Sequence, residues 1–331
     1  MFFSRLRFKA FVIGATFVSL NFIDFANAQT TTLRVGHFPN ITHVQALVAH
    51  GLTRQGKGWF EPRLSKDLNQ TVKVEWFVYN AGPSAMEAIF TGSVDLTYVG
   101  PNPAINGYVR AKGEDIRILA GAANGGSGLV VQPDQNFKTP ADFKGKKIAT
   151  PQFGNTQDVA ARAWMTAGGL RITQTGGDAQ LLPTSNPDQL LLFKNKQLDA
   201  VWTVEPWVSR LETEAGGKVL VEERDAITTV LVTGVKTLNS QRALLASFVK
   251  AQAELTEWIR KNPEEAQTIV NNELEAETRS KMSSDLIKRA WARITLTDTV
   301  SINALEVFFK NAQSAGFLRG SANLSNLLEK P

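Results

Sequence analysis

The feature that most constrains the fold is an alternation of two hydrophobic patterns along residues 32–199. Short runs rich in β-branched apolar residues are separated by longer segments in which apolar residues recur at helical spacing. Strands that alternate with helices form mainly parallel sheets, because a parallel connection needs a crossover long enough to hold a helix. The sequence therefore predicts an α/β fold.

The expected elements follow from this alternation and from the Gly, Pro, Asn and Thr residues that precede the helical segments. Strands are expected at residues 33–38, 72–78, 94–99, 116–120, 147–149, 179–182 and 200–203. Helices are expected at residues 43–54, 84–91, 103–111, 157–167, 187–195 and 206–215. Beyond Val235 we expect helices alone, at residues 243–261, 263–273, 284–292 and 301–315.

Chain length and glycine content predict two lobes. The 331 residues exceed what one hydrophobic core usually organises, since domains commonly divide beyond about 250–300 residues. The glycine-rich segment 121–128 is the expected crossing to the second lobe, and the apolar run 227–233 is the expected return. We assign residues 29–125 and 232–331 to lobe one, with the helical tail packed on it, and residues 126–231 to lobe two.

The crossing should act as a hinge between the lobes. Glycine adopts backbone angles that other residues disfavour, so a β-branched residue at Gly126 or Gly128 is expected to shift the balance between open and closed forms.

The N-terminus has the three parts of a secretory signal peptide. Three basic residues precede an apolar run at residues 10–23, and Ala26-Asn27-Ala28 forms a cleavage site of small residues. The apolar run is shorter than the roughly 20 residues of a membrane-spanning helix. We expect residues 1–28 to be removed and the mature chain to reach the periplasm. Asp24 is unusual beside such a run, and an uncleaved anchor is the alternative.

Composition excludes several classes of function. The chain has no cysteine, which removes disulfides, thiol catalysis, thiolate metal ligands and a lipid anchor attached at cysteine. The formal net charge of +5 includes a contribution from three basic residues and one Asp in the signal peptide. The remaining excess of positive charge is too small to indicate a nucleic-acid partner.

Catalytic patterns are scarce. His37, His43 and His50 lie in the first strand–helix unit, but no acidic residue stands at ligand spacing nearby. We therefore favour ordinary polar packing there and predict no metal. A nucleophile elbow after a strand, a Walker sequence and a dinucleotide fingerprint are all missing. The chain is expected to be neither an enzyme nor a cofactor carrier.

Small and polar residues gather where strands end and helices begin, which is where open parallel sheets bind ligands. Each such junction offers unpaired backbone N–H groups and the positive end of a helix dipole, which together favour an anion. Ser, Asn and Thr are also good helix caps, so a single junction has a purely structural explanation. Recurrence in both lobes favours a cleft site. The candidates are Asn40, Gly82, Pro83, Ser84, Gly100, Pro101, Asn102, Gly154, Asn155, Thr156 and Gln157, with Ser127 from the glycine-rich crossing.

The junction Glu205-Pro206-Trp207 has two explanations that the sequence leaves open. Glu205 could pair with a cationic group of a ligand while Trp207 covers an apolar part. Equally, an acid before a helix complements the helix dipole, and Trp207 could belong to the core.

Five segments occur in a characteristic order: GPS at 82–84, VDLTYVGP at 94–101, DFKGKKIA at 142–149, LDAVW at 198–202 and EPW at 205–207. In this order they resemble the nitrate, sulfonate, taurine and bicarbonate family of transporter substrate-binding proteins, most of all its aliphatic-sulfonate branch. The resemblance covers nearly the whole mature chain.

The resemblance implies a two-lobed periplasmic-binding fold of type II that closes on a small-molecule ligand. The implied partners are an ABC permease and its ATPase, and the protein is expected to be a monomer. The resemblance also implies that the anionic head of the ligand is held at residues 82–84, 100–102 and 154–156. Because these junctions lack Arg and Lys, a monoanion such as an alkyl or aryl sulfonate fits better than a phosphonate, with Trp207 and Phe153 lining an apolar tail.

Other functions remain as alternatives. The ligand could be taurine, nitrate or a neutral or cationic heterocycle such as a pyrimidine precursor, in which case Glu205 would dominate binding. An enzyme acting on such precursors would need a cluster of His and Cys, which a chain without cysteine cannot form. A transcription-regulator effector lobe would need a helix-turn-helix segment before the first strand.

Overall fold

The computed structural model describes residues 1–2 and 30–331. The predicted signal peptide, apart from its first two residues, lies outside the described residues. Among the helices in the described part of the chain, none is long and apolar enough to cross a membrane.

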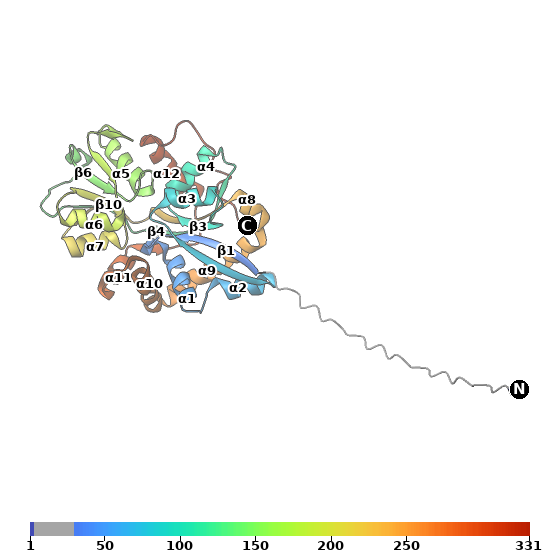
Figure 1. The fold of residues 1–331 in the computed structure, drawn as a ribbon. Coiled ribbons are helices and arrows are strands. Elements are labelled where there is room, and N and C mark those ends of the chain that lie inside the picture. The colour runs from blue at the N-terminus through green and yellow to red at the C-terminus, as the bar shows by residue number, and fades with distance from the viewer. Residues whose placement is uncertain (3–29) are drawn as a thin grey trace.

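Lobe one is built on a six-stranded sheet with the order β13-β4-β12-β3-β1-β2. Figure 1 labels three of these strands, β1, β3 and β4. Strands β1, β2 and β3 run parallel to one another, whereas β12 lies antiparallel between β3 and β4. The strands are β1 (Thr30–His37), β2 (Thr71–Val78), β3 (Leu96–Val99), β4 (Ile116–Gly125), β12 (Ile227–Gly234) and β13 (Ile294–Leu296). The helices before the crossing are η1 (Ile41–His43), α1 (Val44–Arg54), α2 (Phe60–Leu68), α3 (Gly82–Phe90) and α4 (Pro101–Arg110).

Helices cover both faces of this sheet and form a hydrophobic core on each. Successive side chains of a strand point to opposite faces, so neighbouring residues of β12 enter different cores. Leu231 faces the core under α1, α2, α9 and α10, while its neighbours Val230 and Val232 face the core under α3, α4 and α12. In the first core the rings of Phe60 and Phe248 stack with centroids 4.0 Å apart. Burying one such aromatic side chain contributes about 1.5–3 kcal/mol.

Lobe two is built on a five-stranded sheet with the order β11-β5-β10-β6-β9. Its strands are β5 (Ser127–Val131), β6 (Lys147–Thr150), β9 (Gln180–Pro183), β10 (Ala200–Val204) and β11 (Lys218–Glu223). Its helices are η2 (Pro140–Phe143), α5 (Thr156–Ala167), α6 (Asn186–Lys194) and α7 (Trp207–Ala215), and β7 (Ile172–Thr173) and β8 (Gly176–Gly177) form a small hairpin. The predicted two-lobed α/β fold is confirmed.

Two segments join the lobes. The chain passes from β4 to β5 at Gly126 and returns from β11 to β12 through residues 224–226. The return to the sheet of lobe one therefore comes earlier than the boundary expected between residues 231 and 232, because the whole of β12 pairs with β3 and β4. The division of residues between two moving lobes remains a proposal.

The C-terminal segment packs on lobe one, as predicted. Its helices are α8 (Val235–Ser240), α9 (Arg242–Lys261), α10 (Pro263–Thr278), α11 (Ser284–Trp291) and α12 (Ile302–Ser314). Helix α9 packs on α2, α10 on α1, and α12 on α4, while α11 and α12 also reach α7 and α5 of lobe two. The expectation of helices alone was wrong at β13, which extends the sheet beside β4. Three residues are too few to show a strand period.

The crossing at Gly126 gives the first testable prediction. Gly126 has φ of 71°, and a Cβ there would lie 2.7 Å from Cγ2 of Ile294. Gly126→Val should lower the free energy of unfolding by about 1–3 kcal/mol, because a β-branched residue is strained at positive φ. It should also change the open–closed balance, measured by small-angle scattering. Gly145→Val is the control, since Gly145 has φ of 74° but no atom within 4 Å of its added Cβ.

Equal scattering profiles for the two variants would contradict the hinge assignment. The same conformational argument does not hold for Gly128, whose φ is not positive. A Cβ at Gly128 would instead lie 2.8 Å from the carbonyl oxygen of Val221 in β11.

Candidate ligand-binding cleft

The starts of α4 and α5 meet across the two lobes. The backbone N–H of Asn102 in α4 donates to Oγ1 of Thr156 in α5 at 3.4 Å. A Cβ added to Gly100 would lie 2.3 Å from that same oxygen. The start of α3 is packed against α4 as closely, since a Cβ on Gly82 would lie 2.3 Å from Cγ of Pro103. The structure thus brings three of the predicted junctions together.

A second contact between the lobes lies beside these helix starts. Asn80 follows β2, and its Nδ2 donates to the carbonyl oxygen of Pro151, which follows β6, at 3.3 Å. Neither residue was singled out in the sequence. Both stand at the carboxyl end of a strand, the signal that identified the other junctions.

The first junction, which carries Asn40, contacts a different part of lobe two. Oδ1 of Asn40 accepts hydrogen bonds from Nε1 of Trp207 at 3.0 Å and from Nδ2 of Asn186 at 3.3 Å. The backbone N–H of Ile41 donates to the carbonyl oxygen of Glu205 at 2.9 Å. Asn186, at the start of α6, was missed, although it too follows a strand. Its contact with Asn40 makes it a further candidate for the cleft.

Several side chains predicted to bind the ligand make hydrogen bonds to other groups of the protein. Oγ of Ser84 donates to the carbonyl oxygen of Ala81, and Nδ2 of Asn102 donates to the carbonyl oxygen of Phe308 in α12. Asn155 caps α5 by accepting from the backbone N–H of Asp158, whose carboxylate accepts the Gly154 N–H at 2.9 Å. These contacts stabilise the junctions, so the side chains of Ser84, Asn102 and Asn155 are already occupied in this arrangement.

A polar chain crosses lobe two behind the start of α5. Nε2 of Gln157 donates to Oγ of Ser127 at 3.4 Å, and Ser127 donates to Oε2 of Glu223 at 2.5 Å. Nε1 of Trp202 donates to the same carboxylate oxygen at 3.2 Å. Burial raises the pKa of the Glu223 carboxyl above its usual value, although both hydrogen bonds oppose that shift.

This shift predicts a pH dependence of stability. A folded-state pKa above the unfolded value means that the folded state binds the proton more tightly, so the contribution of Glu223 declines as pH rises through the interval between the two pKa values. Glu223→Gln, which cannot ionise, should gain stability relative to the parent chain between pH 4.5 and pH 7.5. Urea unfolding at the two pH values measures the difference, and a constant difference would contradict the assignment.

Glu205 is fully buried, and its carboxylate is used inside the protein. Oε1 accepts from Oγ of Ser209 and from Nη1 of Arg293, both at 2.9 Å, and Oε2 accepts from the backbone N–H of Ser209 at 3.1 Å. Burial raises the pKa of the Glu205 carboxyl above its usual value, although Arg293 and the hydrogen bonds from Ser209 oppose that shift. Trp207 is also buried in the core of lobe two. In this arrangement Glu205 and Trp207 therefore have structural roles: Glu205 forms internal hydrogen bonds, and Trp207 belongs to the core.

An open groove of about 530 Å³ lies beside the starts of α3, α4 and α5. Aromatic and apolar side chains line part of it, among them Pro83, Phe90, Phe153 and Phe317, and the charged residues Glu87, Arg110 and Asp115 line it as well. Phe153 is 41% exposed, and its ring lies 5.1 Å from that of Phe317. Of the two aromatic residues expected to line an apolar tail, Phe153 borders this groove, whereas Trp207 is buried in the core of lobe two.

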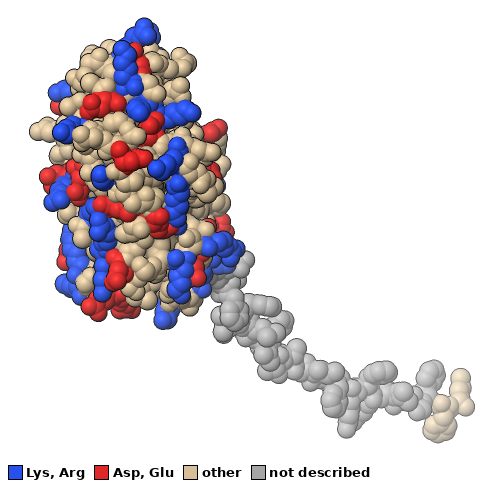
Figure 2. All heavy atoms as spheres, turned by 90° about the vertical axis from the view of Figure 1, so that its left-hand side faces the viewer, with Lys and Arg blue, Asp and Glu red and all other residues tan. Residues whose placement is uncertain are grey.

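The face drawn in Figure 2 shows basic and acidic side chains interspersed rather than gathered by sign. This pattern agrees with the small excess of positive charge in the sequence. It gives no electrostatic footprint for a nucleic acid on that face.

Two α/β lobes joined by two crossings, with helix starts facing one another between them, define a solute-binding protein fold. Residues 26–272 match the NMT1-like family, and the chain belongs to that family.

Curated relatives are similar over part of their length. A protein of Brucella abortus strain 2308, named as a binding protein, is 27% identical over 218 residues, which are 65% of this chain and 60% of that protein. The taurine-binding periplasmic protein of Escherichia coli strain K12 is 24% identical over 149 residues, 45% and 44% of the two chains. The matches thus span less than two thirds of these relatives.

Solved structures show the fold over almost the whole chain. The alkanesulfonate-binding protein SsuA of Xanthomonas axonopodis pv. citri, bound to MOPS, aligns with a TM-score of 0.71 at 18% identity, covering 91% of this chain and 99% of that one. The nitrate-binding protein NrtA of Synechocystis aligns with a TM-score of 0.70 at 16% identity, covering 88% and 83%. These findings confirm the family resemblance inferred from the sequence.

Proposed function

We propose that this protein is the periplasmic solute-binding component of an ABC importer, and that its ligand is a small organic monoanion, most of all an alkyl or aryl sulfonate. The observation that carries the proposal is the meeting of α4 and α5 across the lobes, where Asn102 N–H lies 3.4 Å from Thr156 Oγ1. Helix starts from opposite lobes can then act on one ligand.

The charge of the junctions supports a monoanion. Residues 82–84, 100–102 and 154–156 contain no Lys, Arg, Asp or Glu. Helix N-termini supply partial positive charge without a cation, which suits a singly charged oxyanion better than a doubly charged one. The aromatic part of the neighbouring groove, which includes Phe90, Phe153 and Phe317, offers an apolar surface for the organic part of the ligand.

The contacts between the lobes support a closure mechanism. Asn40, Asn80 and Asn102 each make a hydrogen bond from lobe one to lobe two. A ligand that contacts both lobes binds the closed form more tightly and shifts the population toward it. In the proposed cycle the permease recognises that closed form and receives the ligand.

Titration calorimetry of the mature chain tests this function. The panel is methanesulfonate, an aryl sulfonate, taurine, nitrate and bicarbonate, and we expect the sulfonates to bind with the lowest Kd. Thr156→Val, which keeps the shape but loses the hydroxyl, should weaken sulfonate binding, while Thr166→Val on the far end of α5 is the control. Binding of nitrate or bicarbonate alone would replace the sulfonate proposal, and absence of heat with every ligand would overturn the monoanion class.

A further inference from the structure

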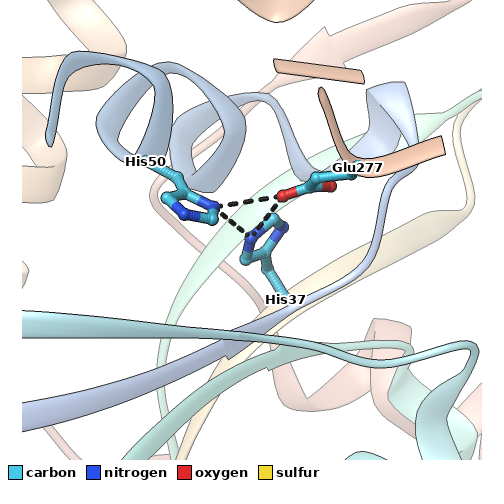
Figure 3. Close-up of side chains that lie close together, drawn as sticks. All are labelled: His37, His50 and Glu277. Atoms are coloured by element: carbon cyan, nitrogen blue, oxygen red, sulfur yellow. Dashed lines mark hydrogen bonds and ion pairs between the residues drawn. The ribbon is translucent and has the colours of Figure 1, made fainter. Parts of the chain in front are cut away.

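Three side chains from distant parts of the chain converge in lobe one, away from the helix starts of the cleft. His37 ends β1, His50 lies in α1, and Glu277 lies in α10. Figure 3 shows the three groups pointing toward one another. Nε2 of His37 lies 3.1 Å from Nδ1 of His50, and each of these nitrogens lies 3.1 Å from Oε1 of Glu277.

We propose that this His37–His50–Glu277 cluster is a binding site for a divalent transition metal, with zinc as the ion that fits best. Zinc binds imidazole nitrogen and carboxylate oxygen at about 2.0–2.2 Å in a tetrahedral arrangement, which separates neighbouring ligand atoms by roughly 3.3–3.5 Å. The three ligand atoms here form a triangle only slightly smaller than one face of that tetrahedron. Two imidazoles and one carboxylate also form a ligand set typical of zinc.

An unpartnered oxygen points to a cation independently of the triangle. The side chain of Glu277 is only 3% exposed, and its Oε2 finds no hydrogen-bond donor among the described residues. A buried carboxylate oxygen without a partner costs free energy comparable to a lost hydrogen bond or more. A metal bound to Glu277 offsets that cost, because it neutralises the carboxylate as a whole.

The surroundings of His37 favour the protonation state that a metal needs. Nδ1 of His37 lies 3.3 Å from the carbonyl oxygen of Phe38, so a proton on Nδ1 has an acceptor there. The lone pair of Nε2 then faces the cluster. Ligand histidines in metal sites are commonly oriented in this way by a carbonyl oxygen bound to the other ring nitrogen.

The surroundings of His50 show which side chain must move before a metal can bind. Metal binding at Nδ1 places the proton on Nε2, which lies 3.3 Å from Nη2 of Arg54, so Arg54 must turn away. The Arg54 side chain is 51% exposed, and turning away would break its two-point ion pair with Glu273, in which Nη2 and Nε lie 2.8 and 2.9 Å from Oε1 and Oε2. Oε1 of Glu273 lies 3.0 Å from Nδ1 of His50 and accepts from Arg54, so either Glu273 released by Arg54 or a water would supply the fourth ligand.

The position of the cluster indicates a structural role. A metal would tie the end of β1 to α1 and α10 directly before the loop that carries Asn40. Trp76 covers the cluster, with its ring 5.5 Å from that of His50 and 5.6 Å from that of His37. The ion would therefore hold the first junction of the cleft in place, and the inference does not depend on which ligand the cleft binds.

Metal binding to the mature chain, without a polyhistidine tag and after treatment with EDTA, tests the proposal. We expect one Zn²⁺ per chain by calorimetry and elemental analysis, and a visible absorption spectrum of tetrahedral Co²⁺ when cobalt replaces zinc. Zinc should raise Tm by about 5 °C at a free concentration 100 times its Kd.

Two variants and one control separate a metal site from a hydrogen-bonded cluster. Glu277→Gln and His50→Gln should each lower zinc affinity by more than about 100-fold, beyond the effect of losing an outer partner of a ligand. Glu275→Gln, in the same helix but on an exposed ion pair with Lys281, should bind zinc like the parent chain. The proposal is overturned if the parent chain neither binds zinc nor gives the cobalt spectrum, or if folded Glu277→Gln binds zinc unchanged.

Discussion

Gly100→Ala should lower ligand affinity by about 10- to 100-fold, which corresponds to a steric cost of ~1–3 kcal/mol. The added Cβ would lie 2.3 Å from Oγ1 of Thr156 in the opposite lobe. The backbone of Gly100 has φ of −68° and ψ of 154°, angles that alanine adopts freely, so the effect should come from the contact between lobes alone. Calorimetry with the sulfonate that binds the parent chain measures the loss, and scattering should show a larger radius of gyration.

The chain offers a matched control for this variant. Gly234 precedes α8 with φ of −75° and ψ of 144°, and a Cβ there would meet its nearest atom only at 3.8 Å. Gly234→Ala should leave affinity and dimensions unchanged. Adding Thr156→Ala to Gly100→Ala should bring the radius of gyration back toward that of the parent chain, because it removes the clashing oxygen. If Gly100→Ala binds like the parent chain, the junctions do not meet in the ligand-bound form.

Glu205→Ala should lower the free energy of unfolding by about 3–5 kcal/mol, the usual cost of breaking a buried ion pair from one side. The substitution removes three hydrogen bonds and leaves Arg293, which is 15% exposed, with Glu212 and the more distant Glu222. Urea unfolding of the parent and the variant at pH 7.5 measures the loss.

Glu222→Ala is the control, because Glu222 is 23% exposed and lies 3.5 Å from the same guanidinium, where an ion pair contributes at most about 1 kcal/mol. Glu205→Gln separates the two candidate ligand classes. If it abolishes ligand binding while the free energy of unfolding stays unchanged, then Glu205 contacts the ligand, and a cationic or neutral heterocycle replaces the monoanion. The internal hydrogen bonds of Glu205 favour the opposite outcome.

Local sequence patterns predicted most of the elements, and the misses have physical reasons. The buried strands β3, β4 and β10 were predicted because short, mostly apolar runs bounded by turn residues are typical of strands covered on both faces. Strand β13 has three residues, too few to show a period. Helix α2 was missed because it buries only Phe60 and Leu64, which leaves a weak apolar stripe. The junctions were recognisable because strand ends and helix starts are local features.

The candidate site was predictable only in part for the same reason. The sequence marked Gly100 and Thr156 as members of separate junctions, and the contact between them follows from the packing of the lobes. Asn186 and Asn80 carry the same local signal but became candidates only through their partners in the other lobe.

The sequence by itself determined the α/β class, the two-lobed plan, the family and the neutral character of the junctions, because hydrophobic period, glycine placement and motif order are local properties of the chain. Only the tertiary structure decided which long-range partner each polar group found. It paired Glu205 with Arg293, 88 residues away, and brought Glu277 to His50, 227 residues away. No local period encodes such partners, since they are selected by the burial of whole helices and sheets against one another.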